Sequence, residues 1–390
     1  LFKRDGVVSG NLLGVAGGRL YDVTTDEGAV NGSGAVSIAG NETGVMIAAG
    51  ADLYGYTATG TLATIALPDG DNCVKVLEGA SRFLAISEDG RIHYSEPLER
   101  TFPALNFFTA ESEADKTIDG LFIDDQLVAF GRETVEFWPN TGNADLPFQP
   151  LQGRVYERGI KATGCATPIG SSFAWVTDQN TVCIQDENNI VSNQGLEARI
   201  AASTEARLFN FFIDGTEFLC LRIDNETQVY NLRTGLWSEF QSYGQDNWLP
   251  QCHAGGVFGS SVDGKTLEWG PDKQDLGGEL ERRFRAGLPI NGGGVSINRL
   301  SLRCNPGSTD FLSGDFADPT VEMRHSRDQG RTFTSYSGVS LGEQGAYREF
   351  LNWRALGMAS QPGFLAEFRV TDPVDFRVSD VLVNEPYGGR

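Results

Sequence analysis

The local pattern that decides the fold is clearest in the stretch Leu127-Val128-Ala129-Phe130-Gly131-Arg132-Glu133-Thr134-Val135-Glu136-Phe137. Its first four residues are apolar, and towards its end apolar residues alternate with polar ones. Short apolar runs and alternation are both typical of β-strands. A glycine between the two strands suits a tight connection. The stretch therefore predicts a β-hairpin.

The same unit recurs along roughly the first 270 residues, with turns rich in Gly, Asp and Asn. The second strands of the hairpins are centred near Leu20, Leu53, Ile92, Val135, Val182, Val229 and Leu267. Their average spacing is about 41 residues, and hairpins with a period of this size are typical of a β-propeller. We predict an all-β protein with a propeller of six or seven blades. A succession of β-sandwiches is the alternative, but it would not explain why the period persists.

A second domain is predicted after residue 286. Leu288-Pro289 is followed by Asn291-Gly292-Gly293-Gly294, which is typical of a loop or linker. Further strands, most of them with alternating polar and apolar residues, are expected at Ser296–Arg303, Thr320–His325, Arg331–Tyr336, Tyr347–Trp353, Gly363–Val370 and Asp375–Val383. We therefore predict a β-propeller body over residues 1–286 and a small antiparallel β-sandwich-like docking domain over residues 287–390.

Composition and charge exclude several classes of protein. The chain has 390 residues, 40% of them hydrophobic, which argues against disorder, and no apolar run is long enough to span a membrane. It has 52 acidic and 31 basic residues, so its net charge is −21. A protein that grips phosphate would normally be basic. The acidic excess lies in residues 1–280, whereas residues 281–390 are neutral overall and contain Arg but no Lys.

Arginine is favoured in buried ion pairs and protein interfaces, so the C-terminal part is expected to dock on partners. The candidate interface residues are Arg282, Arg283 and Arg285 at the domain junction, and Arg354 further on. For the junction cluster, an intramolecular salt-bridge network and an anion site are the alternatives. In the acidic part, Glu111, Glu113 and Asp115 form a candidate solvated loop.

One motif has a defined structural chemistry. Residues 326–333 fit the pattern S-x-D-x-G-x-T-aromatic, the Asp-box turn of sialidases and other β folds, through Ser326, Asp328, Gly330 and Thr332. The carboxylate of Asp328 is expected to cap backbone N–H groups and Gly330 to supply a positive φ. The motif predicts a turn and not an activity, so we assign no catalytic residue.

No metal or cofactor is predicted. The six cysteines are scattered without a C-x-x-C and are expected to be reduced core residues. Cys252-His253 lacks further zinc ligands at a sensible spacing. The segment Asp69-Gly70-Asp71-Asn72 begins like a calcium loop, but Ala80 stands where that loop needs Glu, so a turn is expected.

Much of the chain resembles the tail-hub, or nozzle, proteins of short-tailed bacteriophages, also called packaged-DNA stabilisation proteins. The segments that carry the resemblance are Ala16–Tyr21, Ile118–Phe122, Leu127–Trp138, Thr141–Gly142, Gly159–Cys165, Ser172–Trp175, Trp353–Gly357 and Phe368–Val370. Members of this family usually carry a further N-terminal segment. Since the chain starts at Leu1 without an initiator Met, its native N-terminus is expected to lie upstream.

The resemblance implies a virion protein of the tail, assembled in the host cytoplasm as a sixfold ring, a homohexamer. The ring would lie below the portal and the head-to-tail adaptor, meet a tail needle, plug, or tail fibre or spike, and extend the DNA channel. Double-stranded DNA would pass through without specific binding. An acidic wall suits that role because it repels phosphate, so Glu111, Glu113 and Asp115 are expected to face the channel. The alternatives are a propeller glycosidase or depolymerase, and a propeller that binds receptor glycans.

Overall fold

The computed structural model describes residues 1–3, 12–32, 34–57, 59–110, 115–271, 273–290, 292–348 and 350–384. The chain forms two compact units. Unit 1 consists of Leu1–Gln241 and Gln245–Trp269, and unit 2 of Ser242–Gly244 and Gly270–Arg390. The change between units therefore falls at Trp269–Gly270, earlier than the predicted boundary after residue 286.

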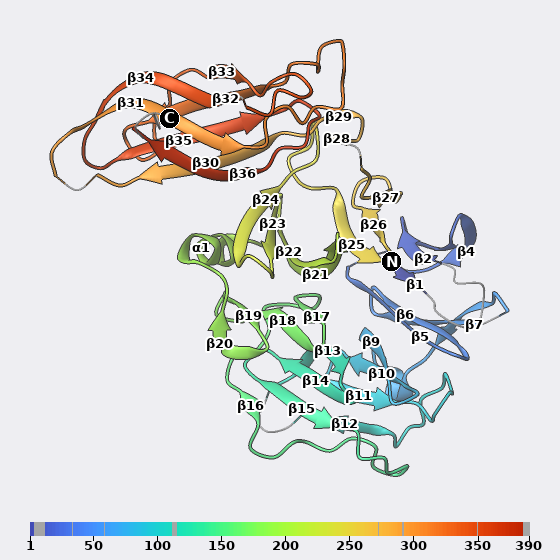
Figure 1. Ribbon diagram of the computed structural model, residues 1–390. Coiled ribbons are helices and arrows are strands. Elements are labelled where there is room, and N and C mark those ends of the chain that lie inside the picture. The colour runs from blue at the N-terminus through green and yellow to red at the C-terminus, as the bar shows by residue number, and fades with distance from the viewer. Residues whose placement is uncertain are drawn as a thin grey trace. The chain divides into compact units, whose positions relative to one another are not determined.

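Within its described residues, unit 1 contains six four-stranded antiparallel sheets followed by one three-stranded sheet (Figure 1). Each sheet is a meander of strands that are consecutive in the sequence. The first three sheets consist of β1 (Phe2–Lys3), β2 (Leu12–Ala16), β3 (Arg19–Asp22) and β4 (Thr25–Ala29); of β5 (Val36–Asn41), β6 (Gly44–Ala49), β7 (Asp52–Thr57) and β8 (Leu62–Ile65); and of β9 (Cys73–Gly79), β10 (Arg82–Ser87), β11 (Arg91–Tyr94) and β12 (Phe107–Thr109).

The remaining sheets of unit 1 follow the same order. They consist of β13 (Thr117–Ile123), β14 (Gln126–Gly131), β15 (Val135–Pro139) and β16 (Val155–Tyr156); of β17 (Ala166–Ile169), β18 (Ser172–Val176), β19 (Val182–Ile184) and β20 (Asp186–Ile190); of β21 (Ala206–Ile213), β22 (Thr216–Ile223), β23 (Glu226–Asn231) and β24 (Leu236–Phe240); and of β25 (Pro250–Ala254), β26 (Val257–Ser260) and β27 (Thr266–Glu268). The predicted hairpin of residues 127–137 is β14 and β15, paired from Gln126↔Pro139 to Phe130↔Val135.

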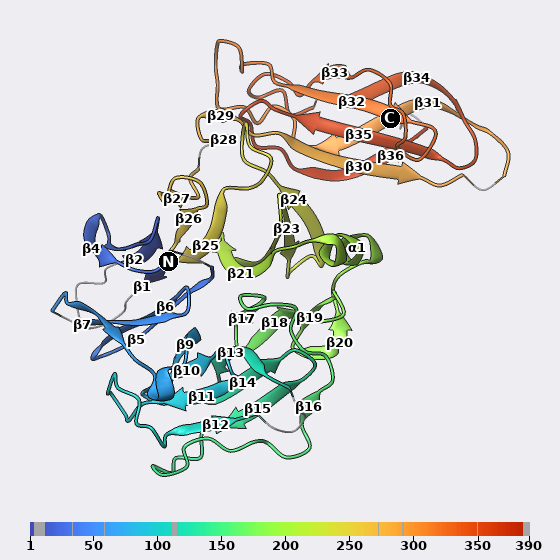
Figure 2. The same cartoon turned by 180° about the vertical axis from the view of Figure 1, so that it is seen from behind.

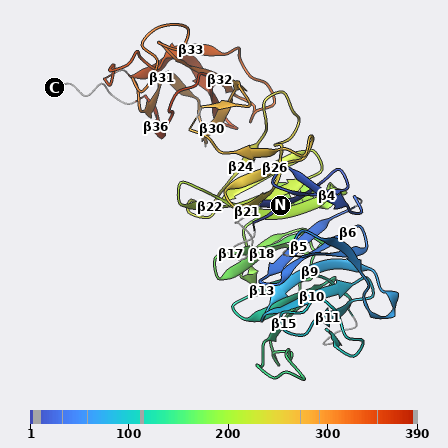
Figure 3. The same cartoon turned by 90° about the vertical axis from the view of Figure 1, so that its right-hand side faces the viewer.

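The sheets of unit 1 follow one another in a ring, as the front and back views show (Figures 1 and 2). The first strands of successive sheets lie side by side, from β5 through β9, β13, β17 and β21 to β25, and β25 in turn contacts β1 of the first sheet. In the side view β5, β9 and β13 are seen next to one another (Figure 3). A closed ring of meander sheets is a β-propeller, so the predicted all-β propeller is confirmed.

Apolar side chains fill the space between neighbouring sheets. One cluster joins the first two sheets through Leu13 and Ile47, and another joins the third and fourth through Leu84 and Leu127. The second strands β6 and β10 are buried along their whole length, and most of β14 and β18 is buried too. Burial on both faces explains why these strands contain apolar runs in the sequence.

The helix α1 (Gln194–Ala202) connects β20 to β21. The side chain of Asn193 accepts a hydrogen bond from the backbone N–H of Leu196 at 3.0 Å and so caps its first turn. Only Leu196 and Ile200 are buried, so the apolar stripe is too narrow to have predicted a helix.

Over the residues that the structure describes, unit 2 contains two antiparallel sheets and a small hairpin. They consist of β30 (Arg282–Leu288), β35 (Phe364–Val370), β32 (Thr320–Ser326) and β33 (Ser337–Ser340); of β34 (Leu351–Ala359), β31 (Val295–Cys304) and β36 (Val378–Val383); and of β28 (Gln274–Asp275) and β29 (Gly278–Glu279). The two larger sheets share one core, which includes Leu300 and Trp353 from one sheet and Met323 and Phe368 from the other. This confirms the predicted β-sandwich.

The pairing of β30 explains why the boundary lies earlier than predicted. Every residue from Arg282 to Leu288 is opposite a residue of β35, so residues 282–286 belong to the sandwich and not to the propeller. The glycine run after residue 290 is a loop inside unit 2 and does not separate two domains.

Candidate interaction surface

Four arginines of unit 2 lie on one face of the sheet that contains β30, β35 and β32. In the strand register, Arg283 is opposite Arg369, and Glu367 lies between Arg285 and Arg324. Residues directly opposite one another in antiparallel strands point to the same face. The alternate residues, such as Phe284 and Phe368, belong to the core. We call Arg283, Arg285, Arg324 and Arg369 the arginine face.

Glu367 holds one half of this face together. It is fully buried, and its carboxylate accepts hydrogen bonds from Arg285 Nε at 2.7 Å, Arg324 Nε at 2.6 Å and the Tyr336 hydroxyl at 2.8 Å. Burial by itself would raise the pKa of Glu367, but these bonds outweigh burial and lower the pKa to about 2. Glu367 therefore stays ionised and fixes both guanidinium groups.

The other half is built around Arg369. Its guanidinium donates to Glu322 Oε2 at 2.8 Å through Nε and lies 3.7 Å from Glu281. The guanidinium also lies over the ring of Tyr336, 4.1 Å from the centroid. Arg324 is 4.5 Å from the ring centroid of Phe333, so ion pairs and cation–π contacts together order the arginines.

The structure brings together two of the four predicted interface residues. Arg283 and Arg285 are on the arginine face, whereas Arg282 points to the opposite side and donates to the backbone carbonyls of Asp372 and Val374. Burial lowers the pKa of Arg282, which acts as an internal tether. Arg354 is exposed on β34 of the other sheet, opposite Arg299.

Sequence reasoning missed the remaining members of the arginine face. Arg324 and Arg369 lie in predicted strands, but which face each residue occupies depends on the alternation within its strand. Arg324 and Arg369 alternate with the core residues Met323 and Phe368. Combining that alternation with the pairing of the strands would have found them.

The Asp-box residues form the turn after β32. Ser326 Oγ donates to Asp328 Oδ1 at 2.7 Å, and Asp328 accepts from the N–H of Thr332 at 2.9 Å and from its hydroxyl at 2.6 Å. These bonds lower the pKa of Asp328. The N–H of Gly330, whose φ is 89°, donates to Ser326 Oγ at 2.8 Å. The carboxylate is thus engaged in holding the turn.

In the predicted acidic loop, Glu111 and Glu113 lie outside the described residues. Asp115 accepts hydrogen bonds from the N–H groups of Arg132, Glu133 and Thr134 at 2.7–2.9 Å, so it caps the turn between β14 and β15. The Asp115 carboxylate therefore stabilises a turn of unit 1.

A buried ion pair among the first strands of the sheets was not predicted. Lys75 Nζ on β9 lies 2.6 Å from Asp119 Oδ1 on β13, and the Asp119 side chain is fully buried. Asp119 also accepts from the N–H of Gly164, just before β17, at 2.6 Å. One carboxylate therefore links three successive sheets.

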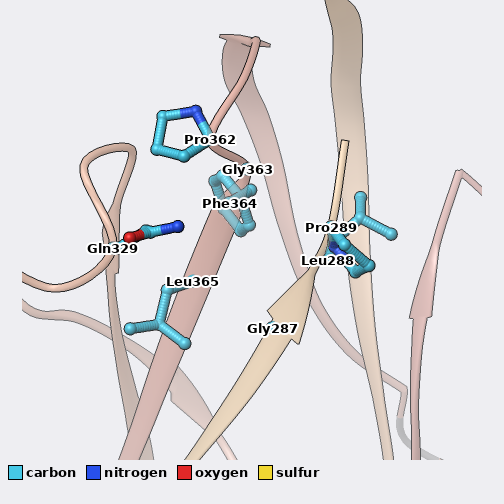
Figure 4. A pocket seen from close by; sticks show the side chains of 8 residues that line it. All are labelled: Gly287, Leu288, Pro289, Gln329, Pro362, Gly363, Phe364 and Leu365. Atoms are coloured by element: carbon cyan, nitrogen blue, oxygen red, sulfur yellow. The ribbon is translucent and has the colours of Figure 1, made fainter. Parts of the chain in front are cut away.

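Two pockets bear on the enzymatic alternatives. A pocket of about 300 Å³ in unit 2 is lined by Gly287, Leu288, Pro289, Gln329, Pro362, Gly363, Phe364 and Leu365 (Figure 4). None of these residues is titratable, so they cannot supply acid–base chemistry. A pocket of about 220 Å³ in unit 1 is lined in part by Glu42 and Glu78, and burial raises the pKa of Glu78.

All six cysteines are free, and burial raises the pKa of Cys73 and Cys165 to about 12. Across the described ranges, no three His, Cys, Asp or Glu side chains are grouped as metal ligands. Among the same residues, no helix has the length and apolar character needed to cross a bilayer.

The fold and this surface define a β-propeller protein that carries an additional β-sandwich unit. Residues 3–249, which contain the strands β2 to β24, match the family described as Bacteriophage P22 Gp10, beta-propeller. The chain belongs to this family. Membership indicates a structural protein of the bacteriophage tail and agrees with the resemblance noted in the sequence.

One relative is the Tail hub protein gp10 of Salmonella phage P22, which is 28% identical over 184 residues. The match covers 43% of this chain and 39% of the relative, so it spans well under half of that protein. Among solved structures, the computationally designed Ika8 protein has a TM-score of 0.40 at 12% identity, covering 64% of this chain and 76% of its own. BamB from Moraxella catarrhalis has a TM-score of 0.39 at 11% identity, covering 68% and 88%.

Proposed function

We propose that the chain is a subunit of a sixfold ring in the short tail of a bacteriophage. The ring extends the DNA channel below the portal and adaptor, helps to retain packaged DNA and conducts the DNA at ejection. The observation that carries the proposal is the family match over residues 3–249, because it includes six of the seven sheets of the propeller. The seven sheets support a propeller of seven blades.

The charge of the chain supports a channel through which DNA slides. Phosphate contacts would hold the strand, whereas a net charge of −21 repels it. The proposed partners are further copies of the chain, the adaptor or portal, and a needle, plug, fibre or spike. Assembly in the host cytoplasm precedes the location in the virion.

Electron microscopy of tails and of the purified protein tests the proposal. We expect the chain in a sixfold ring on the tail axis, and no retention of double-stranded DNA in a gel-shift assay at physiological salt. A chain that is absent from the tail, or that stays monomeric in the purified protein and in assembly mixtures, would contradict it.

Glycan hydrolysis is the second candidate, and the pocket with Glu42 and Glu78 is the observation that favours it. Glycosidases combine two carboxyl groups, one of them with a raised pKa. Incubation with host polysaccharide would release reducing ends steadily if this pocket were catalytic, and Glu78→Gln would abolish the release. We expect neither the unchanged chain nor the Glu78→Gln variant to hydrolyse the polysaccharide.

A further inference from the structure

The arginine face has hydrogen-bonding capacity that the described residues leave unused. The Arg285 side chain is 53% exposed and is bound to Glu367 through Nε, and the Arg283 side chain is 47% exposed and lies 3.6 Å from Glu281. A guanidinium offers five N–H donors. Most donors of these two arginines are therefore available to a partner.

Contacts with neighbouring residues order the side chains of the arginine face. Glu367 fixes Arg285 on one side, and the rings of Phe333 and Tyr336 lie beside Arg324 and Arg369 on the other. Ordering the side chains in advance reduces the entropy that binding must remove. Arginine and tyrosine are also enriched at protein interfaces and among the residues that dominate their affinity.

The chemistry of this face favours carboxylates over nucleic acid. Glu281 and Glu322 are partly exposed between the arginines and would repel a phosphate backbone. A protein surface can place single carboxylates opposite single guanidinium groups, which match them in a bidentate geometry. The chain itself supplies an acidic surface of this kind, because its net charge of −21 arises from residues 1–280.

We propose that the arginine face docks on carboxylates of unit 1 in a second copy of this chain. The inference rests on the proposed ring and names the contact that holds neighbouring copies together. Copies with a charge of −21 repel one another, and a cationic face offsets that repulsion locally. The contact is heterologous, which is the type that closes a ring.

Charge reversal in the full chain tests the contact. We expect the double substitution Arg283→Glu and Arg285→Glu to weaken self-association at least ten-fold in sedimentation velocity. The matched control, Arg331→Glu and Arg348→Glu, reverses two exposed arginines of the same unit and should assemble like the unchanged chain. Arg285→Glu also removes one donor from Glu367, so thermal unfolding is used to show that each variant is folded at the temperature of the assay.

Chemical cross-linking identifies the partner directly. Arg283→Lys places an amine that a carbodiimide couples to a carboxylate within contact distance. In a mixture of isotopically light and heavy copies, we expect cross-links from position 283 of one copy to Asp or Glu of unit 1 in the other. Cross-links only within a copy, or only to unit 2 of the other, would overturn the inference.

The outcomes separate the two proposals. Rings that form equally well in the charge-reversed variant overturn the contact and leave the proposed ring in place. An unchanged chain that never forms a ring overturns both. A gel shift with double-stranded DNA that the charge reversal abolishes would overturn the contact in favour of a nucleic-acid surface.

Discussion

Asp119 links three successive sheets of the propeller. Its buried carboxylate neutralises Lys75 on the neighbouring sheet and accepts the N–H of Gly164 on the next. Removing one member of a buried ion pair leaves the other charge uncompensated, which is far more costly than losing a surface pair.

We therefore expect Asp119→Asn to lower the free energy of unfolding by about 3 kcal/mol, measured with urea. The substitution keeps the shape but strands the charge of Lys75. Asp145→Asn makes the same chemical change at an exposed site and should cost less than about 0.5 kcal/mol. Equal effects of the two substitutions would contradict the structural role of Asp119.

Glu367 gives unit 2 a defined response to acid. Because the folded state lowers the pKa of Glu367 from 4.5 to about 2, its stabilisation is complete above the ordinary pKa and is lost as the pH falls from about 4.5 to 2. The loss is about 2 kcal/mol after allowance for the partly exposed arginines.

Glu367→Gln should remove this acid response. We expect a less stable unit 2 at pH 7 and a flatter dependence of its stability between pH 5 and pH 2, measured by denaturant unfolding at each pH. A variant with the same slope as the unchanged chain would show that other carboxylates govern the acid response.

At the scale of elements, the turn between β14 and β15 is fixed from both sides. Asp115 accepts its N–H groups, and the backbone of Gly159 lies against its peptide. A Cβ at Gly159 would lie 2.2 Å from the carbonyl carbon of Arg132 and 2.3 Å from the nitrogen of Glu133. These backbone atoms belong to a turn whose N–H groups are bound to Asp115, so they cannot withdraw from such a contact without breaking those hydrogen bonds.

Gly159→Ala should therefore destabilise the propeller by about 3 kcal/mol, the upper end of the cost of overpacking. Gly293→Ala is the matched control, because a Cβ there would have no neighbour within 4 Å. Thermal unfolding of both variants measures the difference. A neutral Gly159→Ala would show that the connection before β17 can move.

The sequence predicted the elements of the propeller better than those of the sandwich. The strand pairs near Leu53, Ile92 and Val135 are where the alternation places them. In contrast, the predicted strand at 331–336 is the Asp-box turn and the loop after it. After the capped turn the N–H of Thr334 donates to the carbonyl of His325, but regular pairing with β32 begins at Ser337.

At the scale of the whole molecule, the two units have separate cores. The clusters of the propeller contain residues of unit 1, and the sandwich core contains residues of unit 2. We expect calorimetry to resolve two unfolding transitions. Asp119→Asn should shift the transition of unit 1, and Glu367→Gln should shift the transition of unit 2. A shift of both transitions by either variant would indicate a single cooperative unit.

The excess of acidic residues has structural causes in addition to the proposed channel. Asp115, Asp119 and Asp224 all accept backbone N–H groups in unit 1. Such carboxylates are needed for turns and strand connections, so part of the negative charge has a structural cause. The net charge of the chain is therefore not a direct measure of how acidic the wall of the proposed channel is.

The sequence by itself determined the class of fold. Strand alternation, apolar runs and turn residues are short-range patterns. Their recurrence with a period near 41 residues was sufficient to predict a β-propeller. It also determined that the C-terminal part is rich in arginine. These features depend only on residues that are near one another in the chain.

The tertiary structure alone decided which side chains act together. Arg285 meets Glu367 across 82 positions, and Lys75 meets Asp119 across two sheets. Arg282 and Arg283 are adjacent in sequence yet serve opposite faces, because successive side chains of a strand point in opposite directions. Packing against distant strands decided which of the two faces is covered, and so made Arg282 an internal tether and Arg283 part of a surface.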